Sequence, residues 1–162
     1  MTDASQFGTN VGYYLDDLQV GQRFTSRTHR IDEEQIVAFA KQFDPQPFHL
    51  DAETAKSTFF TGLVASGWHT AAISMRLLVE SNLALAGGVV GAGGEITWPS
   101  PTRPGDILHV EGDILELRPS RSRPDRGMAV LRNTTMNQRG EIVQVLIAKL
   151  VVPRRTSSAK EV

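Results

Sequence analysis

The stretch SGWHTAAISMRLLVESN, residues 66–82, decides the fold of this chain. If this stretch is helical, its residues form little polar surface before Arg76 and Glu80. A helix that is apolar nearly all round is normally buried. Ser66 can cap its first turn, because a serine hydroxyl accepts a hydrogen bond from a backbone N–H of that turn. We therefore expect a long central helix that the rest of the chain covers.

Four segments after this helix carry the pattern of β-strands. They contain β-branched residues in partial alternation with polar ones, and Pro, Gly and Asp residues separate them. The segments are GGEITWPSP, DILHVEGDILELRP, GMAVLRNTTMNQ and EIVQVLIAKLVV, at residues 93–101, 106–119, 127–138 and 141–152. With an earlier strand at residues 23–31, they predict an antiparallel sheet of consecutive hairpins. Such a sheet most economically wraps around the central helix, which gives an α+β fold.

Two shorter helices are expected before the central one. Asp32 can cap the first, which has one apolar face at helical spacing. That face consists of Ile36, Phe39, Ala40 and Phe43. This helix must end at Asp44, because Pro45 disfavours helical geometry in the residue before it. Asp51 can cap the second helix.

The chain of 162 residues is expected to form one domain. Residues 13–153 hold all the predicted elements, whereas residues 1–12 and 154–162 are polar and aperiodic and are expected to be loose. The apolar stretches are interrupted by glycine and too short to cross a bilayer, and the first residues lack the layout of a secretory signal. A cytoplasmic location without a membrane partner is therefore expected.

The composition narrows the chemistry that is available. The net charge of −1 gives no general attraction to nucleic acid. The chain has no cysteine, so thiol nucleophiles and thiolate metal sites are excluded. His49, Asp51 and His69 do not have the spacing of a known metal motif, and we expect no metal. The glycines of residues 87–94 match neither a dinucleotide-binding pattern nor a P-loop.

The segment FDPQPFHLD, residues 43–51, places an acid and an imidazole five positions apart. Asp44 faces the negative end of the helix dipole, so its pKa is expected to be raised. Pro45 and Pro47 favour an extended loop that presents His49. The acid and the imidazole could hold one water between them for acid–base chemistry. Alternatively, Asp44 is an ordinary turn residue before proline and His49 only packs locally.

A longer stretch, FDPQPFHLDAETAKSTFFTGLVASGWHT at residues 43–70, resembles the hydratase signature of the MaoC-like family. The positions that carry the likeness are Asp44, Pro47, His49 and the turn glycine Gly67. WPSPTRPGD at residues 98–106 and the closing strands are similar too, so the resemblance covers roughly residues 13–153. Gln46 and Ser66 depart from the pattern, because Asn and His are usual there.

The resemblance implies a single hot-dog fold and reversible hydration of a trans-2-enoyl-CoA to a (3R)-hydroxyacyl-CoA. Asp44 and His49 would hold the water, with the acid and the base not assigned between them. The Gly67 N–H would bind the thioester oxygen at the start of the central helix. Ser66 would cap this helix, which is the simpler interpretation, or contact the substrate. Coenzyme A would belong to the substrate, so no separate cofactor is expected.

An arginine-rich segment, RPSRSRPDR at residues 118–126, bears on substrate binding. Its Arg121 and Arg123, with the arginines at either end, could bind the phosphates of coenzyme A, although a solvated loop is the commoner fate of such a charge run. Arg103 has the same two interpretations. Hot-dog proteins usually pair two copies, so a homodimer or larger homo-oligomer is expected. Two other functions stay open, an acyl-CoA thioesterase and a non-catalytic subunit that binds acyl thioesters.

Overall fold

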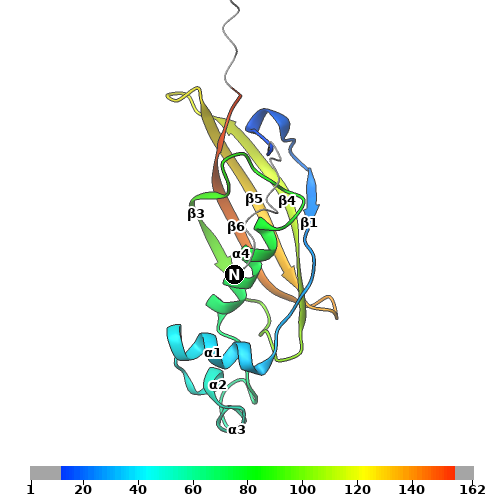
Figure 1. The fold of residues 1–162 in the computed structure, drawn as a ribbon, viewed down its shortest axis with the longest axis vertical. Helices are drawn as coiled ribbons and strands as arrows, with labels where there is room; N and C mark the ends of the chain where they lie inside the picture. The colour runs from blue at the N-terminus through cyan, green and yellow to red at the C-terminus, as the bar shows by residue number, and fades with distance from the viewer. Residues whose placement is uncertain (1–11, 156–162) are drawn as a thin grey trace, which may run out of the picture.

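An antiparallel sheet lies against one long helix in the computed structural model, which describes residues 12–155 (Figure 1). The helix is α4 (Gly67–Val79), the predicted central helix. Across the sheet the order is β1 (Arg23–Thr25), β4 (Ile107–Pro119), β5 (Arg126–Met136), β6 (Ile142–Pro153) and β3 (Val90–Thr97), while β2 (His29–Arg30) also pairs with β4. The predicted α+β fold, with a sheet wrapped around a central helix, is confirmed.

The segments predicted to be loose, residues 1–12 and 154–162, fall mostly outside the described residues. Where the C-terminal segment is described, it is anchored, because Arg154 Nη2 lies 2.8 Å from Asp16 Oδ1. This ion pair ties the end of β6 to the short 3-10 helix η2 (Leu15–Asp17). The first residue after the predicted domain is therefore held against it. None of the helices described is long and apolar enough to cross a membrane.

Two predictions about the sheet are wrong. The single strand expected at residues 23–31 is divided into β1 and β2. Strands β4, β5 and β6 form consecutive hairpins as expected, but β3 pairs with β6 and not with β4. Residues 98–106 must therefore cross from the β3 edge toward the other side of the sheet. Ala65 N donates to Thr102 O at 2.8 Å, and Thr70 Oγ1 lies 3.0 Å from Thr102 Oγ1. The crossing thus passes the first turn of α4.

Three short helices gather at one end of the molecule (Figure 1). They are α1 (Glu33–Phe43), α2 (Pro47–Leu50) and α3 (Ala52–Ala55). Asp32 and Asp51 accept hydrogen bonds at the starts of α1 and α3 as predicted. The expectation of an extended loop between these helices is wrong, because Pro47 occupies a favourable first position of α2 after the extended residue Gln46. His49 therefore projects from a helical turn.

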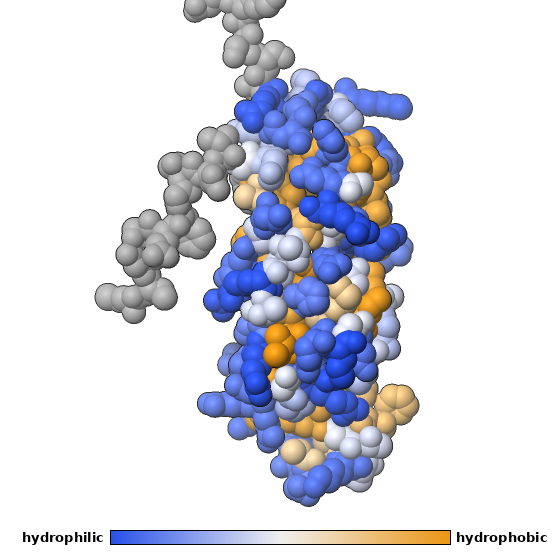
Figure 2. All heavy atoms as spheres, turned by 90° about the vertical axis from the view of Figure 1, so that its right-hand side faces the viewer, coloured by the Kyte–Doolittle hydropathy of each residue, from blue (hydrophilic) through white to orange (hydrophobic). Residues whose placement is uncertain are grey.

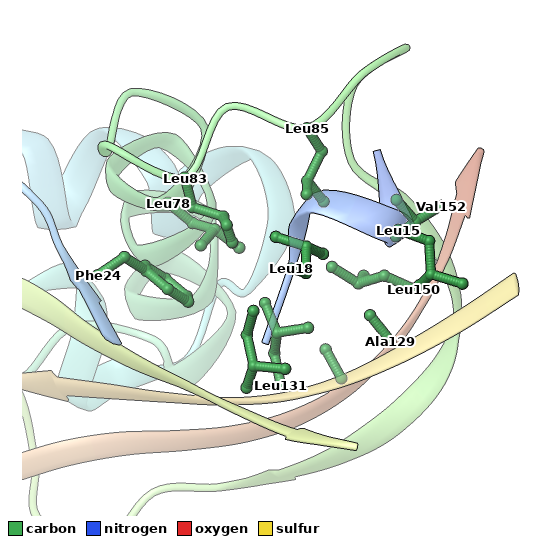
Figure 3. Close-up of a cluster of buried hydrophobic side chains, with 12 residues drawn as sticks. Leu15, Leu18, Phe24, Leu78, Leu83, Leu85, Ala129, Leu131, Leu150 and Val152 are labelled. Atoms are coloured by element: carbon green, nitrogen blue, oxygen red, sulfur yellow. The ribbon is translucent and has the colours of Figure 1, made fainter. Parts of the chain in front are cut away.

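Two clusters of buried apolar side chains form the core. The first packs between η2, β1, the end of α4 and the sheet (Figure 3). The second packs between α1, α3, another face of α4 and the strands β4 and β6. Leu78 belongs to the first cluster, whereas Ile73 and Leu77 belong to the second. Ser74 Oγ, on the same helix, makes a buried 2.7 Å hydrogen bond with Thr135 Oγ1 of β5. The central helix thus joins α1 and α3 to the sheet.

One side of α4 is open, contrary to the expected burial nearly all round. Trp68, Met75 and Val79 are 61%, 42% and 54% exposed. A groove of about 370 Å³ lies between α4 and the edge strand β3, and its walls include Gly91 and Ile96. The face of the molecule on the β1 side, by contrast, is mostly hydrophilic (Figure 2). A single chain therefore leaves an apolar strip of its central helix uncovered.

Gly112 of β4 leaves room for the ring of Phe24, and a Cβ at this position would overlap that buried ring. We expect Gly112→Ala to lower the free energy of unfolding by about 1–3 kcal/mol, because an overpacked core has to shift. Urea denaturation measures this change. The loss should shrink when the same substitution is made in a Phe24→Leu background. An equal loss in both backgrounds would contradict the packing argument.

Candidate active site

A cavity of about 440 Å³ lies at the N-terminal end of α4, where α2 and the 98–106 crossing meet this helix. Its aromatic walls are Phe48, Phe59, Phe60, Trp68 and Trp98. Its polar walls are Asp44, Gln46, His49, Ser66, Thr70, Ser100 and Thr102. An apolar cavity with a few convergent polar groups is typical of a small-molecule site. The acid and the imidazole singled out from the sequence both line it.

Asp44 and His49, called the dyad below, face each other at this cavity. His49 Nε2 lies 3.3 Å from Asp44 Oδ2. The other ring nitrogen, Nδ1, lies 2.7 Å from the carbonyl oxygen of Val64. Since a carbonyl oxygen only accepts, Nδ1 carries the hydrogen of this bond, and Nε2 is the ring nitrogen left to face Asp44. The imidazole is 5% exposed, and its Nε2 faces the carboxylate.

The carboxylate of Asp44 is held by side chains on both of its oxygens. Ser66 Oγ donates to Oδ2 at 2.7 Å, and Gln46 Nε2 donates to Oδ1 at 2.6 Å. Partial burial alone would raise the pKa of Asp44, but these two hydrogen bonds and the nearby His49 outweigh it and lower the pKa below its ordinary value. The expected upward shift is therefore wrong, and Asp44 is ionised at neutral pH.

Ser66 connects the dyad to the central helix. Its hydroxyl accepts a 3.2 Å hydrogen bond from Trp68 N, which is the predicted N-cap interaction, while it donates to Asp44. The hydroxyl is therefore occupied by protein groups, which disfavours the direct substrate contact considered from the sequence. Gly67 follows as the first residue of α4, so its N–H has no carbonyl one turn earlier to bind. This amide belongs to a residue that lines the cavity.

Trp98 is a site residue to which the sequence assigned no role. A Cβ at Gly67 would lie 2.7 Å from Cε2 of the Trp98 indole, so this residue must be glycine for the indole to pack there. Trp98 Nε1 donates to the buried Gln144 Oε1 at 3.0 Å, which fixes the ring. The only indication of its role in the sequence was that Trp98 begins residues 98–106, the second segment that resembles the MaoC-like family. The absence of a side chain at Gly67 thus makes room for the Trp98 indole.

Arg121 and Arg123, for which a contact with coenzyme A was considered, do not line this cavity. Arg121 follows β4 and lines a separate cavity of about 1080 Å³ at the β4–β5 hairpin. Pro153 of β6 pairs with the first residue of β5 at that end, whereas Val143, near the start of β6, lines the dyad cavity. At the rise of a strand, these two ends of β6 are on the order of 30 Å apart. Neither arginine therefore lines the dyad cavity of its own chain.

Arg103 is the arginine that the fold brings near the cavity. Its Nη2 donates to the carbonyl oxygen of Phe60 at 2.9 Å, and Phe60 is part of the cavity wall. The 98–106 crossing carries this arginine there, a connection that the expected hairpin between β3 and β4 would not have made. Of the five arginines considered from the sequence, only Arg103 borders the site.

His69 has a structural environment and does not line the cavity. Its ring stacks on Phe39 of α1, with centroids 4.6 Å apart and an angle of 3° between planes. Burial first, and the charge of His29 second, lower the pKa of His69 from 6.5 to about 4. The carboxylate of Asp51 is engaged with Thr54 N at 2.7 Å. In residues 12–155, no three His, Asp or Glu side chains are grouped as a metal site requires.

Comparison with known protein sequences connects this geometry to a family. A family model described as "MaoC like domain" matches residues 17–135. The uncharacterized protein YdeM of Bacillus subtilis is 34% identical over 128 residues, which are 77% of this chain and 88% of that protein. The 3-hydroxybutyryl-CoA dehydratase of Methylorubrum extorquens is 32% identical over 112 residues, which are 68% of this chain and 69% of that enzyme.

Solved structures agree with the sequence relatives. A MaoC-like dehydratase from Rhodospirillum rubrum is 59% identical, with a TM-score of 0.88 and coverage of 90% of this chain and 100% of that one. The R-hydratase PhaJ1 from Pseudomonas aeruginosa is 26% identical, with a TM-score of 0.70 and coverage of 93% and 94%. The hot-dog fold expected from the sequence is thereby confirmed.

The lowered pKa of His69 predicts a pH dependence of stability. The folded protein keeps this ring neutral down to about pH 4, whereas the unfolded chain protonates it near pH 6.5. Stability should therefore fall as the pH drops from 6.5 toward 4, by at most about 3 kcal/mol from this group. His69→Phe keeps an aromatic ring against Phe39 and should flatten the fall. Denaturation at several pH values tests this, and the same slope in both proteins would refute it.

Proposed function

The chain belongs to the family of MaoC-like domains, and we propose that it is a hydro-lyase acting on a coenzyme A thioester. The reaction is the reversible addition of water to a trans-2-enoyl-CoA, which gives a (3R)-hydroxyacyl-CoA. The observation that carries the proposal is the 3.3 Å approach of Asp44 and His49 at a cavity beside the first amide of α4. The names of the dehydratase and R-hydratase relatives support the same reaction class.

The proposed acid–base step divides the work of the dyad. The water oxygen bonds to C3 while Asp44, ionised because its pKa is lowered, takes one of the water protons. The protonated Nε2 of His49 gives its proton to C2, so one proton enters the dyad and one leaves. A proton then passes from Asp44 Oδ2 to His49 Nε2 across 3.3 Å and restores the starting state. Dehydration follows the same steps in reverse.

The thioester oxygen needs a hydrogen-bond donor, because it gains negative charge as water adds to C3. We assign this role to the N–H of Gly67, which stands at the positive end of the α4 dipole without an intrahelical acceptor. Trp98 packs against Gly67 and limits how this amide can be approached. The proposed reaction uses no cofactor apart from the coenzyme A of the substrate.

The assignment of Asp44 is tested by Asp44→Asn, with Asp51→Asn as its matched control. Both changes remove a carboxylate from the same short stretch, but Asp51 only caps α3. Turnover of crotonyl-CoA should fall about a hundredfold to ten-thousandfold in Asp44→Asn and in His49→Ala, as expected on losing an acid–base group. It should change little in Asp51→Asn. Full activity in either dyad variant would overturn the assignment.

The same assay separates the alternative functions when the enoyl absorbance and free thiol are followed together. A hydratase removes the enoyl absorbance without releasing thiol. A thioesterase releases thiol, and a non-catalytic subunit changes neither signal. The dyad favours the hydratase, because a subunit that only binds acyl thioesters would not need an acid and an imidazole within proton-transfer distance.

We also propose that two copies of the chain associate through the open side of α4. The groove between α4 and β3 is lined by apolar side chains and glycine, and β3 is an edge strand of the sheet. Trp68 contributes to the wall of this groove and to the wall of the dyad cavity. A partner seated in the groove would therefore border the site, which fits a substrate bound near a subunit boundary.

A charge introduced into the groove tests this association. Met75 lines the groove and is 42% exposed, so Met75→Lys should convert a dimer into monomers in sedimentation velocity. Leu115→Lys is the matched control, because Leu115 is 36% exposed on β4, away from the groove. The control should remain dimeric. A native protein that sediments as a monomer at micromolar concentration would contradict the proposal.

A further inference from the structure

Gln46 is bonded to both members of the dyad although its own side chain is exposed. Its backbone N–H donates to Asp44 O at 2.8 Å, and its carbonyl oxygen accepts from His49 N at 2.9 Å. Its side-chain Nε2 donates to Asp44 Oδ1 at 2.6 Å. Within residues 12–155, the side chain donates to no other residue. Gln46 thus binds the acid through backbone and side chain, and the imidazole residue through backbone.

The side-chain bond of Gln46 constrains a rotation that the other contacts leave loose. The terminal torsion of an Asp side chain is broad, so a carboxylate held at one oxygen can still turn. Ser66 and His49 both lie at Oδ2 of Asp44. Gln46 holds the opposite oxygen, Oδ1, and with both oxygens fixed the plane of the carboxylate is fixed. Oδ2 is then kept toward Nε2 of His49.

The backbone around Gln46 is stiff enough to make this bond effective. Pro45 precedes it and Pro47 follows it, and each proline fixes its own φ near −65°. Pro47 also restricts Gln46 to the extended region, where φ is −101° and ψ is 148°. The Cα of Gln46 is therefore held in a fixed position, from which the side chain extends toward Asp44. An Asn at this position would be one methylene shorter and could not place its amide at the same point without a backbone shift.

We propose that Gln46 is a positioning residue, which holds Oδ1 of Asp44 so that Oδ2 faces His49 and the reacting water. The proposal rests on the hydration reaction proposed above, and it assigns Gln46 no contact with the substrate. It also makes Gln46 a source of the low proton affinity of Asp44, since a donor to a carboxylate favours the ionised form. The amide therefore orients the base and keeps it charged.

The test compares Gln46→Ala, Gln46→Glu and Gln46→Asn with Gln42→Ala, an exposed glutamine near the end of α1. Gln46→Ala should lower kcat about ten- to a hundredfold, the factor for losing one hydrogen bond to a charged group, with KM within about twofold. The acid limb of the kcat/KM profile should move to higher pH, and further in Gln46→Glu, where two carboxylates share the position. Gln46→Asn should recover only part of the loss. Gln42→Ala should match the native protein.

A measurement that does not depend on catalysis tests the positioning role of Gln46 separately from the proposed hydratase activity. The pKa of Asp44, followed by NMR of its side-chain carboxyl carbon, should rise in Gln46→Ala even if the protein hydrates no enoyl thioester. An unchanged Asp44 titration would overturn the positioning role, whatever the activity. A loss of activity together with a lower melting temperature and an unmoved acid limb would also overturn it, because it would show that Gln46 only supports the turn.

Discussion

The hydrogen bond from Ser66 Oγ to Asp44 Oδ2 is the interaction on which the site depends. It joins the residue after α1 to the residue before α4, and the same hydroxyl caps α4 through Trp68 N. His49 is tied to the same short segment through its bond to the Val64 carbonyl. The backbone segment of residues 64–68 thus holds the acid, the imidazole and the first amide of the helix in place.

Features of the site that come from neighbouring residues could be predicted from the sequence. A few adjacent residues determine each of these features. The features are the end of α1 before Pro45, the capping by Asp32 and Asp51, and the start of α4 at Gly67. Family likeness then identified which acid and imidazole to pair. The approach of these side chains was not visible in the spacing alone, because α2 turns a segment that its prolines had suggested would be extended.

Features that depend on distant partners could not be predicted. The predicted direction of the Asp44 pKa shift was wrong because it rested on the helix dipole alone, whereas Ser66, from a later segment, and Gln46 both donate to the carboxylate. The pairing of β3 with β6 was missed because successive strands usually form hairpins. That pairing matters for function, since the resulting crossing places Trp98 over Gly67 and Arg103 beside the cavity wall.

The central claim is that Asp44 and His49 hold one water next to a thioester whose oxygen binds the start of α4. A crystal structure with butyryl-CoA, a saturated thioester that cannot be hydrated, tests it most directly. We expect the thioester oxygen about 3 Å from Gly67 N and an ordered water that is hydrogen-bonded to both members of the dyad. A thioester bound away from this amide, or a dyad that shares no water facing the acyl chain, would contradict the account.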